Sequence, residues 1–222
     1  MAFGDVNAMN AAAGFVVPTG PHYHEVPWYT QLLACTACPA RQEARRVVPG
    51  QGPLAAEICI VGQNPGTDED EKGVPFIGRS GDEVGVWLRL MGLDRAKVLV
   101  TNIVKCHTEG NRAPRPKEIE TCESLWWKRE LETFTNLAVV IPLGRPALLG
   151  LIGKQPSLPD VMEPWWVKAA FGERELHILP LAHPAYLLRT PAARPVMYEK
   201  VLPVLRDYMR REAPHVYQRA AL

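Results

Sequence analysis

Apolar residues recur along this chain in two spacings, which together predict buried strands alternating with amphipathic helices. Four short apolar runs, rich in β-branched residues, suit strands of a buried parallel sheet: residues 58–61, 98–105, 137–143 and 176–181. Apolar residues at helical spacing follow the first run, and Ser80 with Glu83 forms a capping box that predicts where this helix begins. The alternation predicts an α/β fold of three layers, α/β/α, around a central sheet of four mostly parallel strands.

Further helices are expected between and after these strands. Their predicted positions are residues 28–34, 117–134, 144–153 and a terminal amphipathic helix through 197–208. Pro203 lies inside the last of these and lacks a backbone N–H, so it must kink or interrupt that helix. Glycine and proline punctuate residues 154–164, which predicts a loop, and residues 165–175 fit either a strand or a hairpin.

The polar stretch between the first strand and its helix is the main candidate for a site. It contains the turn Gly62-Gln63-Asn64-Pro65-Gly66 at the carboxyl end of the strand, followed by an acidic run at residues 68–71. In open α/β sheets, ligands bind in the crevice outside the carboxyl ends of the strands. We expect the four acidic side chains to be solvated or to cap a helix, and the alternative is that one of them serves as a base.

At 222 residues with 47% hydrophobic content, the chain is long enough for one domain with a sizeable core. The net charge of +1 provides no overall field that attracts nucleic acid, so any such binding must come from a local patch. No apolar run approaches the roughly 18 residues of a membrane span, and the N-terminal residues lack the pattern of a signal peptide. We therefore expect a cytoplasmic monomer without membrane contact, with a flexible arm at residues 1–27, a domain at 28–212 and a C-terminal tail at 213–222.

Four of the five cysteines form a candidate ligand set. Cys35 and Cys38 make a CxxC pair, and fifteen residues of predicted loop and helix separate Cys106 from Cys122. A chain without an export signal does not suit a disulfide framework, which favours a metal or a cluster. A zinc ribbon more often repeats CxxC in its second half, so the spacing favours an iron–sulfur cluster, with zinc or four unrelated core cysteines as alternatives. Cys59 lies within the first strand and is expected to be a buried small hydrophobe.

Four segments of the chain together resemble one known family. They are CTACPARQEARRVVPGQG, GQNPGTDEDEKGVPFIGRSG, TNIVKCHTEGNRAPRPKEIETC and LAHPAYLLRTP. In this order, over roughly residues 28–212, they resemble the iron–sulfur uracil-DNA glycosylases, most closely family 4 of the uracil-DNA glycosylase superfamily. The resemblance implies a four-stranded parallel sheet between helices, in agreement with the pattern above, and a [4Fe–4S] cluster on Cys35, Cys38, Cys106 and Cys122.

The resemblance also implies which residues bind and release the base. Phe76 matches the aromatic residue that stacks on a flipped base, and Asn102 matches the asparagine that reads the edge of that base. Gly62 and Gly66 belong to the turn that is expected to line the base. His183 matches a histidine whose N–H stabilises the charge growing on the departing base, an effect worth about 10²–10³ in rate.

Two positions depart from the family pattern. Family 4 usually has a glutamate after the first glycine, thought to position or activate the attacking water, and this chain has Gln63. Asn64 beside it resembles the asparagine-bearing motif of the mismatch-specific and single-strand-selective branches. A general base is typically worth about 10²–10⁴ in rate, so we expect a working but slower enzyme in which Asn64 or Gln63 holds the water. After the third cysteine, residues 107–109 are His-Thr-Glu where the family usually has Arg-Pro-Pro, so the contacts that the family makes through these three residues do not carry over to this chain.

Contacts with DNA are expected from short loops. Arg112 and Arg115 follow the third cysteine, and Arg189 follows the HPA motif. Side chains of this kind neutralise phosphates and make binding salt-dependent. Leu188, or its neighbour Leu187, is the candidate for a wedge that fills the gap left by the flipped base.

The sequence therefore predicts a monofunctional glycosylase that excises uracil from DNA in base excision repair. No lysine stands at a motif position that would form a Schiff base, so lyase activity is not expected. One alternative is a glycosylase for another deaminated base, such as hypoxanthine, or for a mismatched pyrimidine. The other alternative is a damaged-DNA-binding protein that lost catalysis with the change to Gln63.

Overall fold

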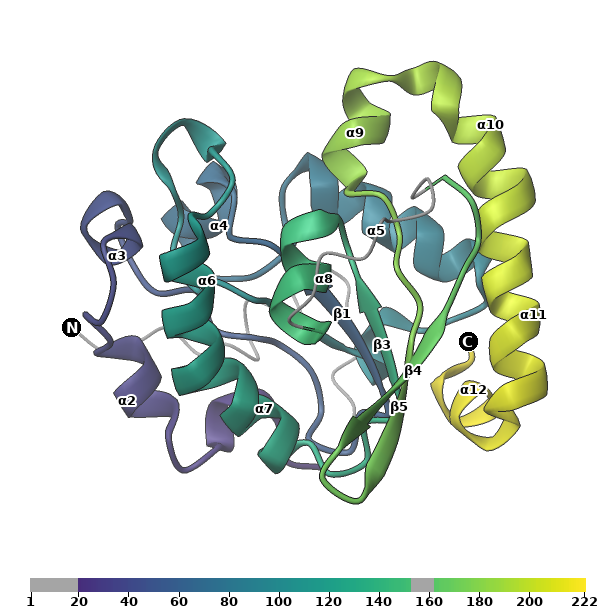
Figure 1. Ribbon diagram of the computed structural model, residues 1–222, viewed down its shortest axis with the longest axis horizontal. Helices are drawn as coiled ribbons and strands as arrows, with labels where there is room; N and C mark the ends of the chain where they lie inside the picture. The colour runs from purple at the N-terminus through teal and green to yellow at the C-terminus, as the bar shows by residue number, and fades with distance from the viewer. Residues whose placement is uncertain (1–19, 153–161) are drawn as a thin grey trace.

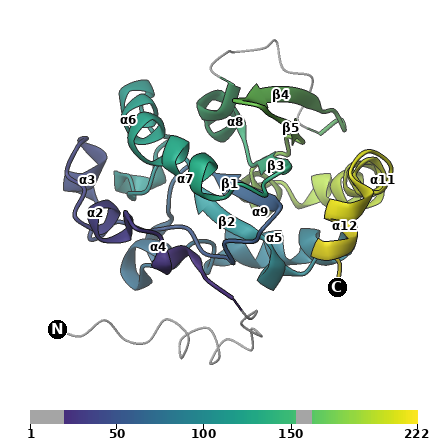
Figure 2. The ribbon, with the colours of Figure 1, turned by 90° about the horizontal axis from the view of Figure 1, so that it is seen from below.

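The computed structural model describes residues 20–152 and 162–222, in which a β-sheet lies between two layers of helices (Figure 1, Figure 2). The sheet of the described residues has five strands in the order β2-β1-β3-β5-β4. The strands are β1 Ile58–Gly62, β2 Leu99–Asn102, β3 Val139–Pro142, β4 Val167–Phe171 and β5 Arg174–Ile178. The pairs β1·β2, β1·β3 and β3·β5 are parallel, and β4 is antiparallel to β5.

The predicted α/β class is confirmed, but the prediction of four strands is wrong because the sheet has a fifth. Residues 165–175, which fitted a strand or a hairpin, contribute β4 and the turn at Gly172 that leads into β5. The side chains of β4 are exposed or half-buried, so this edge strand has no apolar run that a sequence pattern would reveal. The fourth predicted strand begins earlier than expected, at Arg174, and ends at Ile178. Beyond its end, Leu181 still pairs with Leu143.

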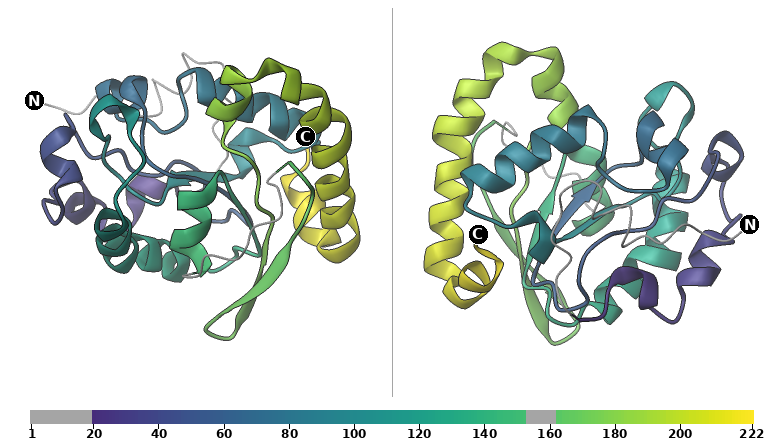
Figure 3. Two further views of the ribbon diagram at one scale, coloured as in Figure 1. Left: turned by 45° about the horizontal axis from the view of Figure 1, so that its top comes forward. Right: turned by 180° about the vertical axis from the view of Figure 1, so that it is seen from behind.

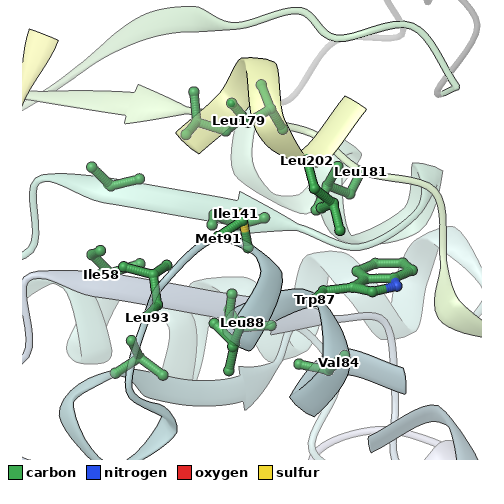
Figure 4. Packing of buried hydrophobic residues seen from close by; sticks show 14 of the residues in the cluster. Ile58, Val84, Trp87, Leu88, Met91, Leu93, Ile141, Leu179, Leu181 and Leu202 are labelled. Atoms are coloured by element: carbon green, nitrogen blue, oxygen red, sulfur yellow. The ribbon is translucent and has the colours of Figure 1, made fainter. Parts of the chain in front are cut away.

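Alternate residues of β1 face two separate hydrophobic cores. Ile58 and Ile60 belong to one core, and Cys59 and Val61 belong to the other. The first core is covered by α5 Arg79–Leu90, α9 Pro184–Arg189, α11 Leu202–Glu212 and α12 Pro214–Ala220. The second is covered by α2 Tyr29–Leu33, α3 Ala40–Glu43, α6 Pro116–Cys122, α7 Lys128–Thr133 and α8 Arg145–Ile152. Figure 4 shows the first core from close by, and Figure 3 shows α11, in yellow, along one edge of the molecule in both views.

Two predicted helices are continuous but change their turn midway. The π-helical turns and a short helix involved are η4 Glu123–Trp127, η6 Met197–Val201 and α10 Arg194–Val196. The predicted helix over 117–134 is α6, η4 and α7 in succession, and the C-terminal helix is α10, η6 and α11. Pro203 is the second residue of α11 and comes directly after the π-helical turn η6. The helix continues past Pro203 although this residue has no backbone N–H to donate. Within α11, Val204 is exposed, whereas Leu202 and Leu205 are buried.

The start of α5 differs from the sequence prediction. The helix begins at Arg79 behind an N-cap at Gly78, so the predicted capping box of Ser80 and Glu83 is wrong. Glu83 instead accepts a hydrogen bond from Nε1 of Trp87 at 2.9 Å. The remaining short elements are α4 Thr67–Lys72, η1 Tyr23–Glu25, η2 Arg95–Lys97, η3 Glu109–Asn111 and η5 Pro191–Ala193.

Both ends of the described chain contact the domain. Residues 1–19 of the predicted arm lie outside the described residues, but the buried hydroxyl of Tyr23 donates to Glu130 at 2.5 Å. The residues predicted as a C-terminal tail form α12, and the hydroxyl of Tyr217 donates to the carbonyl oxygen of Met91 at 2.9 Å. Within residues 20–152 and 162–222, no helix has the length and apolar character needed to cross a membrane.

A buried ion pair ties β2 to the helical layer. Nζ of Lys105 donates to both carboxylate oxygens of Glu130, at 2.7 and 2.8 Å, and the two side chains are 1% and 0% exposed. The hydroxyls of Tyr23 and Thr101 also donate to Glu130, and Lys105 also donates to the carbonyl oxygen of Asn102 at 2.7 Å. A buried charge is tolerated when it is paired and hydrogen-bonded, and this network meets both conditions.

Replacing Lys105 by Met is expected to lower the free energy of unfolding by about 3–5 kcal/mol, because the Glu130 carboxylate stays buried without its cation. Urea unfolding measures the change. Lys117→Met is the matched control, because the ion pair of Lys117 with Glu120 is solvent-exposed and such pairs contribute little. Equal free energies of unfolding for the two variants would show that the buried pair does not stabilise the fold.

Candidate active site at the carboxyl ends of the parallel strands

The last residues of β1 and β2 are Gly62 and Asn102, and they are neighbours in the register of the sheet. Because the two strands are parallel, their carboxyl ends bring the first polar loop beside the segment that follows β2. The amides of Ile103 and Val104 extend this contact by donating to the carbonyl oxygens of Gly62 and Gln63, each at 2.9 Å. These backbone hydrogen bonds hold the predicted turn and the predicted base-reading residue side by side.

Gly62 has no Cβ, and two candidate side chains occupy the space that one would fill. A Cβ added there would collide with Oδ1 of Asn102 and would lie 2.5 Å from Cζ of Phe76. The Asn102 amide and the Phe76 ring therefore both lie against the Gly62 backbone, and any larger residue would displace one of them. Three residues that the sequence predicted for the site are in contact here.

Phe76 has a left-handed backbone, with φ of +54°, which is strained for a residue that carries a side chain. The guanidinium of Arg95 donates to the carbonyl oxygen of Phe76 at 3.0 Å. Gly81 lies so close to the same carbonyl that a Cβ there would collide with it. Oε1 of Glu69 accepts from the amides of the two residues after Phe76, at 2.9 and 2.8 Å. Several independent contacts thus hold the strained backbone that carries the ring.

Asn102 presents an unused hydrogen-bond donor. Its side chain is 2% exposed, and within the described parts of the chain its Nδ2 has no hydrogen-bond partner. Leaving a buried donor unpaired costs about 1–3 kcal/mol, so such groups are rare in folded proteins. The main chain of Asn102 is fixed by strand pairing and by the hydrogen bond from Lys105. A fixed, orphaned donor beside an aromatic ring is suited to bind an acceptor on a ligand.

His183 lies at the same edge of the sheet, beyond β3 and β5. Leu143, which follows β3, lies between the other two segments. Its amide donates a hydrogen bond to the carbonyl oxygen of Val61 in β1 at 2.8 Å, and its backbone pairs with that of Leu181, after β5. His183 comes two residues after Leu181 and is the N-cap of α9. His183 therefore shares the edge of the sheet with the turn at Gly62.

The imidazole of His183 is neutral near pH 7. Its Nδ1 accepts a hydrogen bond from the amide of Ala185 at 3.2 Å, which requires Nδ1 to be unprotonated. Burial, and to a lesser extent the positive charge of Arg189, lower the pKa of His183 from 6.5 to about 4. The single ring proton is therefore on Nε2, which is free to donate.

The two residues that depart from the family pattern lie in the same turn. Nδ2 of Asn64 donates to Oγ1 of Thr108 at 3.0 Å and to the carbonyl oxygen of Pro65 at 3.3 Å. Gln63 is half-buried and is held by its carbonyl oxygen, as described above. Gly66 is the N-cap of α4, and a Cβ on it would meet Oε2 of Glu69. The buried carboxylate of Glu69 thus packs against Gly66 in this turn.

Two of the four acidic residues predicted to be solvated or capping charges are buried instead. Glu69 binds the amides after Phe76, and Asp70 accepts from the amides of Arg45 and Arg46 at 3.0 and 3.3 Å. Both carboxylates are committed to hydrogen bonds with backbone amides. Glu69 and Asp70 therefore shape the loop, and this geometry does not support the alternative of either one as a base.

The predicted DNA-contacting arginines differ in their availability. Both guanidinium ends of Arg112 bind carboxylates, with Glu43 at 2.6 Å and Glu118 at 2.8 and 2.9 Å. These bonds raise the pKa of Arg112 and offset its charge, which weakens the case for a phosphate contact. Arg115 is exposed, 3.8 Å from Glu118, and Arg189 is exposed on α9.

The wedge candidates on α9 also differ in exposure. Leu187 is fully buried in the first core, and Leu188 is half-buried. Tyr186 is a large exposed side chain, three residues after His183, and sequence reasoning missed it. The helical period predicts that Tyr186 is exposed, because adjacent residues face different sides of α9 and Leu187 is the one that faces the core.

The predicted ligand cysteines share one small cavity. Its lining includes Cys35, Cys38, Cys106 and Cys122. The indole N–H of Trp126, which also lines the cavity, donates to Sγ of Cys35 at 3.3 Å. Among the described residues, no three His, Cys, Asp or Glu side chains have the spacing of ligands to a single metal ion.

The buried thiols are protonated in the absence of a cation. Burial raises the pKa of Cys122 to about 12, and burial together with the neighbouring thiols raises the pKa of Cys106. A bound metal centre would reverse this preference, because it binds the thiolate. Cys59 is completely buried in β1, which confirms its prediction as a core residue.

Comparison with known proteins agrees with this geometry. Residues 49–206 match the family described as the Uracil DNA glycosylase superfamily. The chain is 36% identical over 163 residues to the Type-4 uracil-DNA glycosylase of Thermotoga maritima, covering 72% of this chain and 80% of that protein. It is 32% identical over 174 residues to the Type-4 uracil-DNA glycosylase of Sulfurisphaera tokodaii, covering 76% and 78%. The chain therefore belongs to the uracil DNA glycosylase superfamily. Within it, the relatives from Thermotoga maritima, Sulfurisphaera tokodaii and Archaeoglobus fulgidus are type-4 proteins, which confirms the resemblance inferred from the motifs.

The lowered pKa of His183 predicts an acid-sensitive contribution to stability. Between pH 6.5 and about 4, the unfolded chain binds a proton at this residue and the folded protein does not, so stability falls as the pH decreases through this range. At about 1.4 kcal/mol per pH unit, the loss is about 3 kcal/mol. His183→Asn keeps a side-chain acceptor for the Ala185 amide but cannot be protonated. Chemical unfolding of both proteins at pH 7 and pH 4.5 measures the difference, and parallel losses would contradict the assignment.

Proposed function

We propose that this protein is a monofunctional DNA glycosylase that excises uracil from DNA by hydrolysing the N-glycosidic bond in base excision repair. The observation that carries the proposal is the contact at Gly62, where the Phe76 ring lies beside the Asn102 amide, whose nitrogen no described residue binds. Membership of the uracil DNA glycosylase superfamily and relatives named Type-4 uracil-DNA glycosylase support this substrate.

Base recognition follows from the donor and acceptor pattern of the Asn102 amide. A uracil stacked on Phe76 presents an acceptor at O4 and a donor at N3–H. Nδ2 of Asn102 donates to the first, and Oδ1 accepts from the second. Cytosine offers an amino donor and a bare N3 acceptor at these places, so the same amide would face two mismatched pairs. Buried polar groups left unpaired in this way give strong discrimination.

Departure of the base is assisted by His183. As the glycosidic bond lengthens, negative charge grows on the uracil oxygens, and the Nε2–H of a neutral imidazole donates to O2. The Ala185 amide fixes the tautomer that makes this possible. A pre-positioned donor of this kind contributes about 10²–10³ in rate.

Water attack proceeds without a carboxylate at the position of Gln63. Glycoside hydrolysis passes through an oxocarbenium-like transition state, in which the sugar carbon is already electrophilic. The water then needs placement and an acceptor for its hydrogen more than full deprotonation. Asn64, assisted by Gln63, accepts a hydrogen bond from the water but does not take its proton. That proton passes to solvent or to the departing uracil anion once the bond from the water oxygen to the sugar carbon has formed, so the enzyme is active but slower than one with a carboxylate at this position. Lys105, the lysine nearest to Asn102, is bonded to Glu130 and buried, which supports a monofunctional enzyme.

The four cysteines that share one cavity, together with the N–H···S bond of Trp126, fit a [4Fe–4S] cluster. We propose that Cys35, Cys38, Cys106 and Cys122 hold it. The cluster would supply a covalent brace, which joins the N-terminal segment of Cys35 to the loop after β2 and to α6. That brace lies next to Lys105, which also lines the cavity and binds Asn102.

Binding of DNA is assigned to exposed groups at this edge of the sheet. Arg115 and Arg189 neutralise phosphates, and Leu188 with Tyr186 occupies the gap in the base stack. Arg112 contributes mainly by holding its loop through two carboxylates.

The function is tested with oligonucleotides that carry uracil, hypoxanthine or thymine opposite guanine, under single-turnover conditions. We expect release of uracil and cleavage of the resulting abasic site by alkali. Asn64→Ala is expected to lower the rate roughly 10²-fold, at the lower end of general-base effects. Asn136→Ala, an exposed asparagine before β3, is the matched control and should retain the full rate.

The other outcomes have definite meanings. Release of hypoxanthine or mismatched thymine in preference to uracil would replace the substrate assignment. Tight binding of uracil-containing DNA without release of any base would make the protein a non-catalytic damage binder. An unchanged rate for Asn64→Ala would contradict the role given to that residue.

The cluster is tested by its iron content. We expect the protein purified without oxygen to be brown and to contain about four iron atoms per chain. Cys106→Ala is expected to lose iron and to unfold at a lower temperature. Cys59→Ala, a change at the buried fifth cysteine, is the matched control and should keep its iron. A colourless protein that contains stoichiometric zinc would overturn the assignment.

A further inference from the structure

We propose that Thr108 is a positioning residue that orients the Asn64 amide, so that Oδ1 of Asn64 is available to accept a hydrogen bond from the attacking water. The inference rests on the proposed function and assigns a role to a residue for which the family resemblance predicts none. Thr108 lies on the loop after β2, while Asn64 lies on the turn after β1, so the contact joins the two segments that depart from the family pattern.

The direction of the hydrogen bond is set by the chemistry of a hydroxyl. Oγ1 of Thr108 donates its only hydrogen to the carbonyl oxygen of Arg112, at 2.6 Å. Toward Asn64 the hydroxyl can therefore only accept. The Asn64 atom that faces it at 3.0 Å must be the amide nitrogen. The orientation of this amide is thus determined by its neighbours.

A second acceptor reinforces the same orientation. The carbonyl oxygen of Pro65 lies 3.3 Å from Nδ2 of Asn64, so both amide hydrogens point at acceptors. A flipped amide would put Oδ1 against two oxygens that have no hydrogen to offer it. In the observed orientation, no described residue donates to Oδ1, and the side chain is only half-buried. The free acceptor is the group that a carboxylate would otherwise provide.

The loop that carries Thr108 is itself firmly held. Thr108 is completely buried, and the side chain of Arg112, whose carbonyl takes the hydroxyl hydrogen, is bonded to Glu43 and Glu118. The preceding residue, His107, has Nδ1 2.9 Å from the carbonyl oxygen of Pro65, which can only accept. Two consecutive side chains therefore support the turn of Asn64. A proline at position 108 would have no hydroxyl with which to do this.

The test compares Thr108→Val with Thr108→Ser in single-turnover release of uracil. Thr108→Val keeps the shape but removes the hydroxyl, and the rate should fall roughly 5- to 10-fold, in line with the loss of one orienting hydrogen bond. The affinity for uracil-containing DNA should not change, because Thr108 is buried and touches no substrate. Thr108→Ser retains the hydroxyl and should restore the rate to within about 2-fold. An unchanged rate for Thr108→Val would overturn the proposal.

A double-mutant cycle separates positioning from general support of the loop. If Thr108 acts through Asn64, then Asn64→Ala and Asn64→Ala/Thr108→Val should release uracil at the same rate. Equal fold losses from Thr108→Val in both backgrounds would overturn the proposal. Thr133→Val is the matched control, because Thr133 also accepts an N–H, from Trp28 at 3.0 Å, and its loss should leave the rate unchanged.

Two further points keep the outcomes distinct. If Thr108→Val does not fold, Thr108→Ala removes the hydroxyl without placing a methyl against the Arg112 carbonyl, and the same comparison applies. If the wild-type protein releases no uracil, the proposed function fails. If it releases uracil and only the Thr108 series shows no effect, the function stands and this inference fails.

Discussion

The site depends on the absence of a side chain at Gly62. The end of β1 approaches both the ring of Phe76 and the amide of Asn102 so closely that a single methyl group would displace one of them. The contact joins a residue from the loop before α5 to a residue at the end of β2, and parallel pairing of β1 with β2 sets their relative height. In the proposed function a flat base needs a face to stack on and an edge to bind, and Phe76 and Asn102 would provide both around one backbone atom.

The buried charged groups near this contact form hydrogen bonds with the backbone and are not available for the reaction. Glu69 and Asp70 are buried carboxylates, yet each binds amides of neighbouring loops. The Lys105–Glu130 pair also supports the backbone, because Lys105 donates to the carbonyl oxygen of Asn102. The charged residues hold irregular segments in place, and the groups offered to a ligand are neutral: an amide, an aromatic ring and an imidazole. This division suits a reaction in which negative charge develops on the departing base.

Sequence reasoning found β1, β2 and β3 because each is a fully buried run that contains β-branched residues, and it found β5 from an apolar run that overlaps its second half. It missed β4, whose side chains are largely exposed, and α4, whose acidic residues have no apolar stripe. It predicted that Glu69 and Asp70 are solvated or capping charges, because hydrogen bonds between a buried carboxylate and backbone amides have no signature in the sequence. That Phe76 and Asn102 belong to one site was anticipated only through motif resemblance. The bond between Asn64 and Thr108 depends on the direction of one hydroxyl, which only coordinates can reveal.

The wide turn η4 has an optical consequence. It carries Trp126 into the cavity of the four cysteines, where its ring nitrogen meets Cys35. The chain has six tryptophans, and among the residues that line this cavity Trp126 is the one indole. Emission from an indole is quenched by an absorbing inorganic group at contact distance. If the thiols hold the proposed cluster, the fluorescence of Trp126 would be quenched by it, and intrinsic fluorescence would report whether the cluster is bound.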